Sequence, residues 1–146
     1  MAAPHFDDDA LVAAARAVRA HAWAPFSHFA VGAALRHRDG RLVTGCNVEN
    51  ATYGLTVCAE RVAVFKAISE GMRPGEFTAV VVVADTEEPT PPCGACRQIL
   101  WEFCGDIPVV MATPTEVKAV LGLGDLLPRP FDGRFLSTDK ERRAEG

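Results

Sequence analysis

The sequence predicts an α/β fold: a three-layer α/β/α sandwich with a mixed five-stranded sheet, its elements in the order αββαβαββ. Segments with helical periodicity alternate with short apolar runs of strand length. Asp39 and Gly40 stand between two such runs, which is a hairpin signal. Residues 79–84 are apolar without alternation, as in a strand that helices cover on both faces. These features together indicate one mixed sheet between layers of helices.

The N-terminal third is expected to form a helix followed by a hairpin. Apolar residues recur at helical spacing over residues 8–21, and aspartates stand at the beginning, where a helix favours negative charge. Residues 29–35 and 42–44 are then the strands of the hairpin, joined by a turn at residues 38–40.

The middle of the chain predicts two helices around the central strand. The first covers residues 58–69, with Gly71 as its stop signal. Residues 80–83 form the central strand. The second helix covers residues 93–103 and follows Pro92, at a position where a missing N–H costs little.

The C-terminal third supplies the last two strands, residues 109–111 and 117–121, around a turn at Pro114. A chain of 146 residues has the length of one domain, which we place at residues 1–136. Residues 137–146 are polar enough to be a frayed tail.

Charge and hydropathy exclude several functional classes. The formal net charge of −4 gives no general attraction for the phosphates of a nucleic-acid polymer, so a small uncharged substrate is favoured. The longest apolar run is far shorter than the ~20 residues that span a bilayer, so we expect no membrane association. The N-terminus does not resemble a signal peptide, and a cytoplasmic protein is expected.

Three cysteines and one glutamate carry the chemistry that the sequence predicts. Cys58 begins one expected helix, and Cys93 and Cys96 lie in the first turn of another. A helix N-terminus stabilises the thiolate that a metal requires. Three protein ligands are typical of a catalytic zinc, whose fourth position is left for water or substrate. Glu60, two residues after Cys58, is the candidate for moving a proton to and from that water.

Other interpretations of the cysteines stay open. A structural zinc knuckle would need a fourth ligand, yet all four histidines lie in the N-terminal quarter without ligand spacing. A redox pair of Cys93 and Cys96 would leave Cys58 and Glu60 without a role. Cys46 and Cys104 are expected to be small apolar core residues.

The basic residues beside the ligands are the expected charge compensation. Three thiolates on one Zn²⁺ leave one net negative charge. Arg61 and Arg97 are adjacent in sequence to the site and are the predicted compensating groups. Gln98 follows Arg97 and is placed with the two arginines behind the metal ligands.

The chain resembles the cytidine deaminases, in particular the short, homotetrameric class of the zinc-dependent cytidine/deoxycytidylate deaminase family. A Cys-x-Glu followed by Pro-Cys-x-x-Cys is the deaminase signature. The resemblance covers most of the chain and is carried by residues 25–29, 31–34, 45–51, 58–61, 92–98 and 126–128. It implies one Zn²⁺ per subunit and hydrolysis of cytidine and 2′-deoxycytidine to uridine and 2′-deoxyuridine with release of ammonia, as in pyrimidine salvage.

The resemblance also assigns the substrate contacts. Asn47 and Glu49 match the pair that holds the ribose 3′-hydroxyl, and two polar side chains one residue apart point the same way on an extended segment. Phe29 matches the aromatic residue that packs against the pyrimidine. The backbone N–H of Ala59 matches the donor to the base carbonyl. Taken alone, Phe29 would more often be a core residue, and Asn47 and Glu49 turn and surface residues.

Two aromatic residues, Tyr53 and Phe131, match residues that complete the pocket of a neighbouring subunit in these tetramers. Three positions depart from the usual pattern and bear on pocket shape. Phe26 stands where tyrosine is more usual, Gly54 where proline is common, and Pro91 where serine is common. Proline keeps the carbonyl that contacts the exocyclic amine in this family and loses only the N–H.

Three other functions compete with this interpretation. A deaminase of the blasticidin S type would differ at the sugar site, where Asn47 and Glu49 favour ordinary nucleosides. A polymer-editing deaminase would be expected to show a basic face. A non-catalytic, zinc-stabilised binding module would leave Glu60 incidental.

Overall fold

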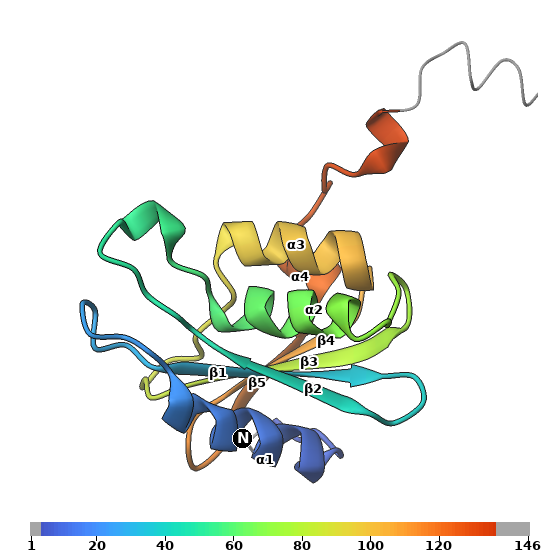
Figure 1. The fold of residues 1–146 in the computed structure, drawn as a ribbon. Helices are drawn as coiled ribbons and strands as arrows, with labels where there is room; N and C mark the ends of the chain where they lie inside the picture. The colour runs from blue at the N-terminus through green and yellow to red at the C-terminus, as the bar shows by residue number, and fades with distance from the viewer. Residues whose placement is uncertain (1–3, 137–146) are drawn as a thin grey trace, which may run out of the picture.

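The computed structural model describes residues 4–136 and places a five-stranded mixed sheet at the centre of the molecule (Figure 1). The strand order is β2-β1-β3-β4-β5, in which only β3 and β4 are parallel and the other neighbours are antiparallel. The strands are β1 (Val31–His37), β2 (Leu42–Cys46), β3 (Phe77–Ala84), β4 (Pro108–Ala112) and β5 (Val117–Gly122). The mixed sheet with β3 as its central strand confirms the prediction.

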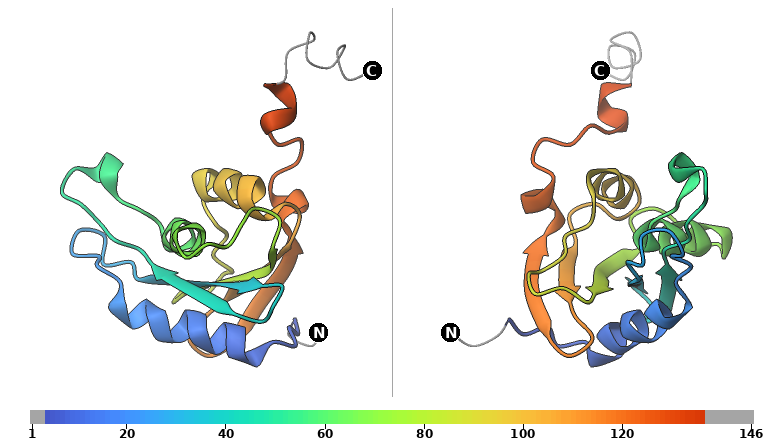
Figure 2. Two further views of the ribbon diagram at one scale, coloured as in Figure 1. Left: turned by 45° about the vertical axis from the view of Figure 1, so that its right-hand side comes forward. Right: turned by 90° about the vertical axis from the view of Figure 1, so that its left-hand side faces the viewer.

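Helices cover both faces of this sheet. Among the α-helices of residues 4–136, α1 (Asp9–Val18) lies on one face, and α2 (Ala59–Ser69), α3 (Gly94–Cys104) and α4 (Leu123–Leu126) lie on the other (Figures 1 and 2). The three-layer sandwich is therefore as predicted, with α4 as an addition after β5. None of the helices in residues 4–136 is both long enough and apolar enough to cross a membrane.

From Ala79 to Ala84 the side chains of β3 are buried on both faces, as its unbroken valine run predicts. Val80 belongs to the core beneath α2 and α3, whereas Val81 and Val83 belong to the core beneath α1. Val82 packs with Ala59 at the beginning of α2. The central strand thus joins the two hydrophobic layers and fixes the start of α2 against the sheet.

Two glycines allow helices to pack unusually close to the hairpin. A Cβ at Gly45 in β2 would lie 2.5 Å from the Ala59 carbonyl oxygen and 2.5 Å from the Ala63 nitrogen of α2. A Cβ at Gly32 in β1 would lie 2.1 Å from the Ala15 carbonyl oxygen of α1. The helix that begins with Ala59 is therefore held directly on the backbone of β2.

The ends of the helices follow the signals in the sequence. The Asp8 side chain accepts a hydrogen bond from the Leu11 amide at 2.9 Å and caps α1. Beyond Val18 the expected helix continues to His21 only as a 3₁₀ turn. Gly71 ends α2 with φ of +95°, and the Met72 amide bonds the Ala67 carbonyl in a Schellman pattern.

Some features differ from the prediction. The first strand begins at Val31 rather than at Phe29, and β3 begins at Phe77. Short helical segments at Tyr53–Leu55, Leu123–Leu126 and Gly133–Phe135 were not predicted. The expected polar tail, residues 137–146, lies outside the described residues.

Candidate metal centre and substrate pocket

Two helix N-termini bring three thiols together. Cys58 is the N-cap of α2, Cys93 is the N-cap of α3, and Cys96 lies in the first turn of α3. Their sulfur atoms all lie within 4.8 Å of one another, and the Sγ atoms of Cys58 and Cys93 are 3.9 Å apart. Sulfurs bound at about 2.3 Å to one tetrahedral zinc would be about 3.8 Å apart. The donor set and its spacing fit zinc.

The negative charge of the thiols has a cationic partner. Arg61 donates from Nη2 to Cys58 Sγ at 3.1 Å, and its buried Nε has no hydrogen-bond partner among residues 4–136. Hydrogen bonds from Cys96 and then from Arg61 lower the pKa of the Cys58 thiol to about 5. The pKa of Cys96 is raised, first by its bond to Cys58 and then by burial. Cys58 is thus held as a thiolate, the form in which it binds a metal.

Glu60 lies in the first turn of α2 with its side chain directed into the interior. It is 4% exposed, although a glutamate is almost never so buried without a partner. Burial is the main cause of its raised pKa, and the neighbouring Cys58 charge acts in the same direction. A carboxylate in this environment accepts a proton more readily near neutral pH.

The thiols and Glu60 open onto a cavity of about 270 Å³, close to the lower limit of ligand pockets in proteins. Its walls come from the chain before β1, the chain after β2, the start of α2 and the chain between β3 and α3. The lining residues are Ser27, Phe29, Val31, Asn47, Glu49, Thr56, Cys58, Ala59, Glu60, Val82, Thr90, Pro91 and Cys93. The structure therefore brings seven of the predicted site residues to one small pocket.

Asn47 and Glu49 lie on an extended segment, since Val48 between them bridges both Trp23 and Val57. The Asn47 amide is 8% exposed, donates from Nδ2 to the Phe29 carbonyl at 2.7 Å and accepts from the Val31 amide at 2.9 Å. Asn47 therefore fastens the end of β2 to the entry of β1.

The Glu49 carboxylate accepts three hydrogen bonds. The amides of Phe26 and Ser27 each donate to Oε1 at 3.0 Å, and the Ser27 hydroxyl donates to Oε2. These bonds, the Ser27 hydroxyl first, lower the pKa of Glu49. Glu49 is consequently ionised at neutral pH and can only accept from a ligand.

Comparison with known proteins agrees with this geometry. The family described as "Cytidine and deoxycytidylate deaminase zinc-binding region" matches residues 6–113, which is most of the chain. The chain belongs to this deaminase family. Among its relatives, a cytidine deaminase of Sporosarcina psychrophila is 45% identical over 137 residues, covering 93% of this chain and 99% of the relative. One of Halalkalibacterium halodurans is 49% identical over 135 residues, covering 86% of this chain and 94% of the relative.

Solved structures show the same deaminase fold. The cytidine deaminase of Burkholderia pseudomallei superposes with a TM-score of 0.82 at 50% identity, covering 86% of this chain and all of that one. The cytidine deaminase of Mycobacterium tuberculosis gives a TM-score of 0.72 at 41% identity, with 88% and 99% covered. The pocket is therefore interpreted as the active site of a zinc-dependent deaminase.

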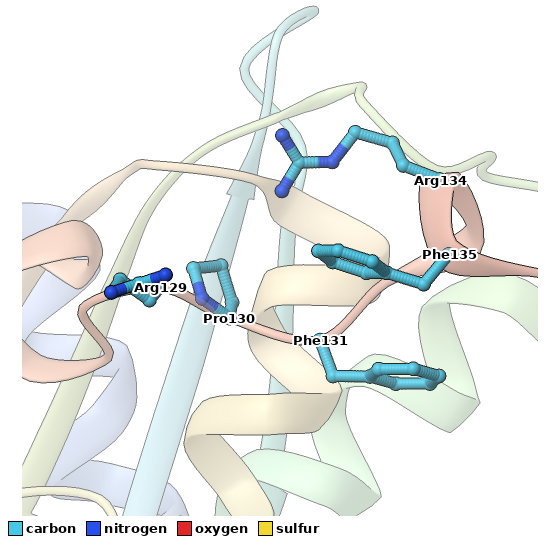
Figure 3. Close-up of a pocket in the computed structure, with 5 residues that line it drawn as sticks. All are labelled: Arg129, Pro130, Phe131, Arg134 and Phe135. Atoms are coloured by element: carbon cyan, nitrogen blue, oxygen red, sulfur yellow. The ribbon is translucent and has the colours of Figure 1, made fainter.

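Two aromatic residues with expected roles in substrate binding, Tyr53 and Phe131, lie outside the pocket. Tyr53 is 75% exposed beside Phe26, with the two rings edge to face. Phe131 is 56% exposed on the segment after α4 and stacks on Phe135, and the Arg134 guanidinium lies over the ring of Phe135 (Figure 3). Neither ring lines the cavity at the thiols.

The residues that follow Cys96 contact main-chain carbonyls. Arg97 donates from Nε to the Pro92 carbonyl and from Nη1 to the Leu126 carbonyl, both at 2.8 Å. Gln98 donates from Nε2 to the Phe131 carbonyl at 2.6 Å. Of the two predicted compensating arginines, Arg61 contacts a sulfur, whereas the contacts of Arg97 hold the chain on both sides of α3.

Sequence reasoning did not identify three polar pocket residues: Ser27, Thr56 and Thr90. The Thr86 hydroxyl donates to the Glu88 carbonyl at 2.7 Å, so Thr90 is the donor in the 2.7 Å bond between the two threonines. Ser27 and Thr90 lie in loops without periodicity. Ser27 lies within the segment 25–29 that carries the family resemblance but was assigned no role, and the signal for Thr90 is its proximity to Pro91.

Proposed function

We propose that this deaminase hydrolyses cytidine and 2′-deoxycytidine to uridine and 2′-deoxyuridine and releases ammonia. The observation that carries the proposal is the shared pocket. A buried carboxyl, Glu60, and the thiols Cys58 and Cys93 line the same cavity as Asn47 and Glu49. The relatives named cytidine deaminase, which match this chain over most of its length, support it.

Cys58, Cys93 and Cys96 would hold the zinc, one ion per subunit. When bound, zinc supplies water acidic enough to act as a nucleophile at neutral pH. Arg61 offsets the excess negative charge of the three thiolates through its bond to Cys58.

Glu60 serves as base and then as acid. Its carboxylate takes a proton from the attacking water and gives it to ring N3, which makes C4 more electrophilic. After attack at C4, Glu60 transfers the second proton of the water to the exocyclic amine, which leaves as ammonia. The burial of Glu60 excludes bulk water from these transfers.

The remaining pocket residues orient the nucleoside. Asn47 and Glu49 bind a sugar hydroxyl, and the Phe29 ring packs against the pyrimidine. Ala59, the first residue of α2, offers one of the amides that have no partner inside the helix. The carbonyl of Pro91, which also lines the pocket, accepts from the exocyclic amine.

Assembly is the second part of the proposal. The exposed rings of Tyr53 and Phe131 support a homotetramer in which each complements the pocket of a neighbouring subunit. The net charge of −4 supports a nucleoside rather than a nucleic-acid polymer as substrate. A cytoplasmic location is consistent with such a role in pyrimidine salvage.

The test follows the ultraviolet absorbance of cytidine, 2′-deoxycytidine, cytosine and blasticidin S in one assay, with bound zinc measured on the same sample. We expect turnover of the two nucleosides and little of cytosine. Turnover of blasticidin S alone would show that the substrate is an aminonucleoside antibiotic and not cytidine. Zinc-loaded protein that converts none of the four would instead indicate a binding module.

A further inference from the structure

We infer that Ser27 is a positioning residue of the nucleoside pocket: its hydroxyl orients Glu49 so that the carboxylate accepts one hydroxyl of the sugar. This role rests on the proposed function and adds a residue to it. Ser27 lines the cavity that contains Glu49 and Glu60.

The direction of each hydrogen bond follows from proton counting. A serine hydroxyl has one proton, and an ionised carboxylate can only accept, so Ser27 Oγ donates to Glu49 Oε2. The same oxygen accepts from the Phe29 amide at 3.0 Å. One hydroxyl therefore connects the proposed sugar-binding carboxylate to the backbone of the proposed base-packing residue.

The hydrogen bonds that Glu49 already accepts limit how many donors of a ligand its carboxylate can still bind. A carboxylate has about two acceptor sites on each oxygen. Both sites of Oε1 are occupied by the amides of Phe26 and Ser27, and one site of Oε2 is occupied by the Ser27 hydroxyl. One acceptor site remains, and it suits a single hydroxyl donor. A phosphate at the same sugar position would bring two like charges together and is disfavoured.

The loop that carries Ser27 is itself fixed. His28 adopts φ of +58°, which is uncommon for a residue other than glycine, and its amide bonds the Ala24 carbonyl at 3.0 Å. The amide bonds to Oε1 do not depend on the serine side chain. Loss of the hydroxyl should therefore leave Glu49 in place but free to turn Oε2 away from the substrate.

The experiment compares cytidine with 3′-deoxycytidine, which lacks the hydroxyl donor. In Ser27→Ala we expect kcat/KM for cytidine to fall about 10-fold, the size expected for a bond to a charged group, and mostly through KM. The value for 3′-deoxycytidine should change less than twofold. Ser27→Thr should restore discrimination between the two nucleosides. Ser69→Ala is the matched control, because that hydroxyl donates to the Lys66 carbonyl at the far end of α2.

Different failures separate the two proposals. If Ser27→Ala slows both nucleosides equally, or neither, Ser27 does not act through the sugar contact and the inference is wrong. A second test uses the Glu49→Gln background, in which Ser27→Ala should have no further effect on discrimination; an undiminished effect there also overturns the inference. If the unmodified, zinc-loaded enzyme converts neither nucleoside, the proposed function itself fails.

Discussion

Gly45→Ala tests whether the position of α2 sets the activity. The added Cβ would lie 2.5 Å from both the Ala59 carbonyl oxygen and the Ala63 nitrogen. Carbon makes favourable contacts with such atoms only beyond about 3.5 Å, so α2 must move away from β2 by about 1 Å. Overpacking of this kind costs about 1–3 kcal/mol of folding free energy.

The same displacement should affect catalysis much more than stability. Cys58 and Glu60 flank Ala59, so a shift of α2 moves a proposed metal ligand and the proposed proton carrier together. A misplacement of about 1 Å costs about 100-fold in rate. Because a domain of this size typically has about 5–15 kcal/mol of stability, most Gly45→Ala molecules remain folded while kcat/KM falls about 100-fold.

The assay combines cytidine turnover with urea unfolding and zinc content. Gly32→Ala is the matched control, since its Cβ would lie 2.1 Å from Ala15 in α1, on the opposite face of the sheet. That variant should lose at least as much stability yet keep activity within about fivefold per folded molecule, because α1 carries no pocket residue. Equal activity of Gly45→Ala and the parent chain, or equal loss of activity in both variants, would refute this account.

Three further predictions follow from the site and from the hairpin. Glu60→Gln should retain zinc and lose about 10²–10⁴-fold in kcat, the usual contribution of a general acid–base; near-normal turnover with zinc bound would contradict the assignment. Cys93→Ala should bind less than one zinc per chain by atomic absorption and lose solubility, and a full zinc content would show that the thiol is not a ligand. The buried His37 bonds Glu76 at 2.7 Å and also contacts Asp39, and the Glu76 bond is the main cause of its raised pKa. Protonated His37 therefore stabilises the fold fully below its unfolded pKa of about 6.5, and this contribution disappears as the pH rises through the higher folded value. In thermal melts the advantage over His37→Gln should shrink above pH 6.5, and a constant difference would exclude this linkage.

The sequence predicts those parts of the fold whose signals are local and repeated. Helical periodicity and the stop at Gly71 place α2 correctly, and the unbroken valines place β3 at the centre of the sheet. The first strand begins two residues later than expected because side chains bind the backbone of Phe29. The Ser27 hydroxyl accepts a hydrogen bond from the Phe29 amide, and the Asn47 side chain donates one to the Phe29 carbonyl. Neither backbone group of Phe29 therefore joins the ladder of β1. Segments of three or four residues, such as α4, are too short for periodicity to reveal.

In the candidate site, too, residues in locally spaced motifs are predictable and residues placed by long-range contacts are not. Cys58, Glu60, Cys93 and Cys96 are predictable because their chemistry depends on positions within two helix starts. Ser27 reaches the pocket through a loop whose path depends on bonds to residues about twenty positions later. No spacing rule within the sequence describes such a contact.

The contacts of the two arginines near the metal centre account for its electrostatics and its placement. Arg61 lies one turn after Cys58 on α2 and reaches its sulfur, so it balances charge. Arg97 lies four residues after Cys93, but it bonds the Pro92 carbonyl and the Leu126 carbonyl, which fixes the entry to α3 against α4. The N-terminus of α3 adds partial positive charge at the thiols without a side chain. One arginine and two helix ends therefore offset the single negative charge that three thiolates would leave on a bound zinc, and the second arginine helps to fix the helix that carries Cys93 and Cys96.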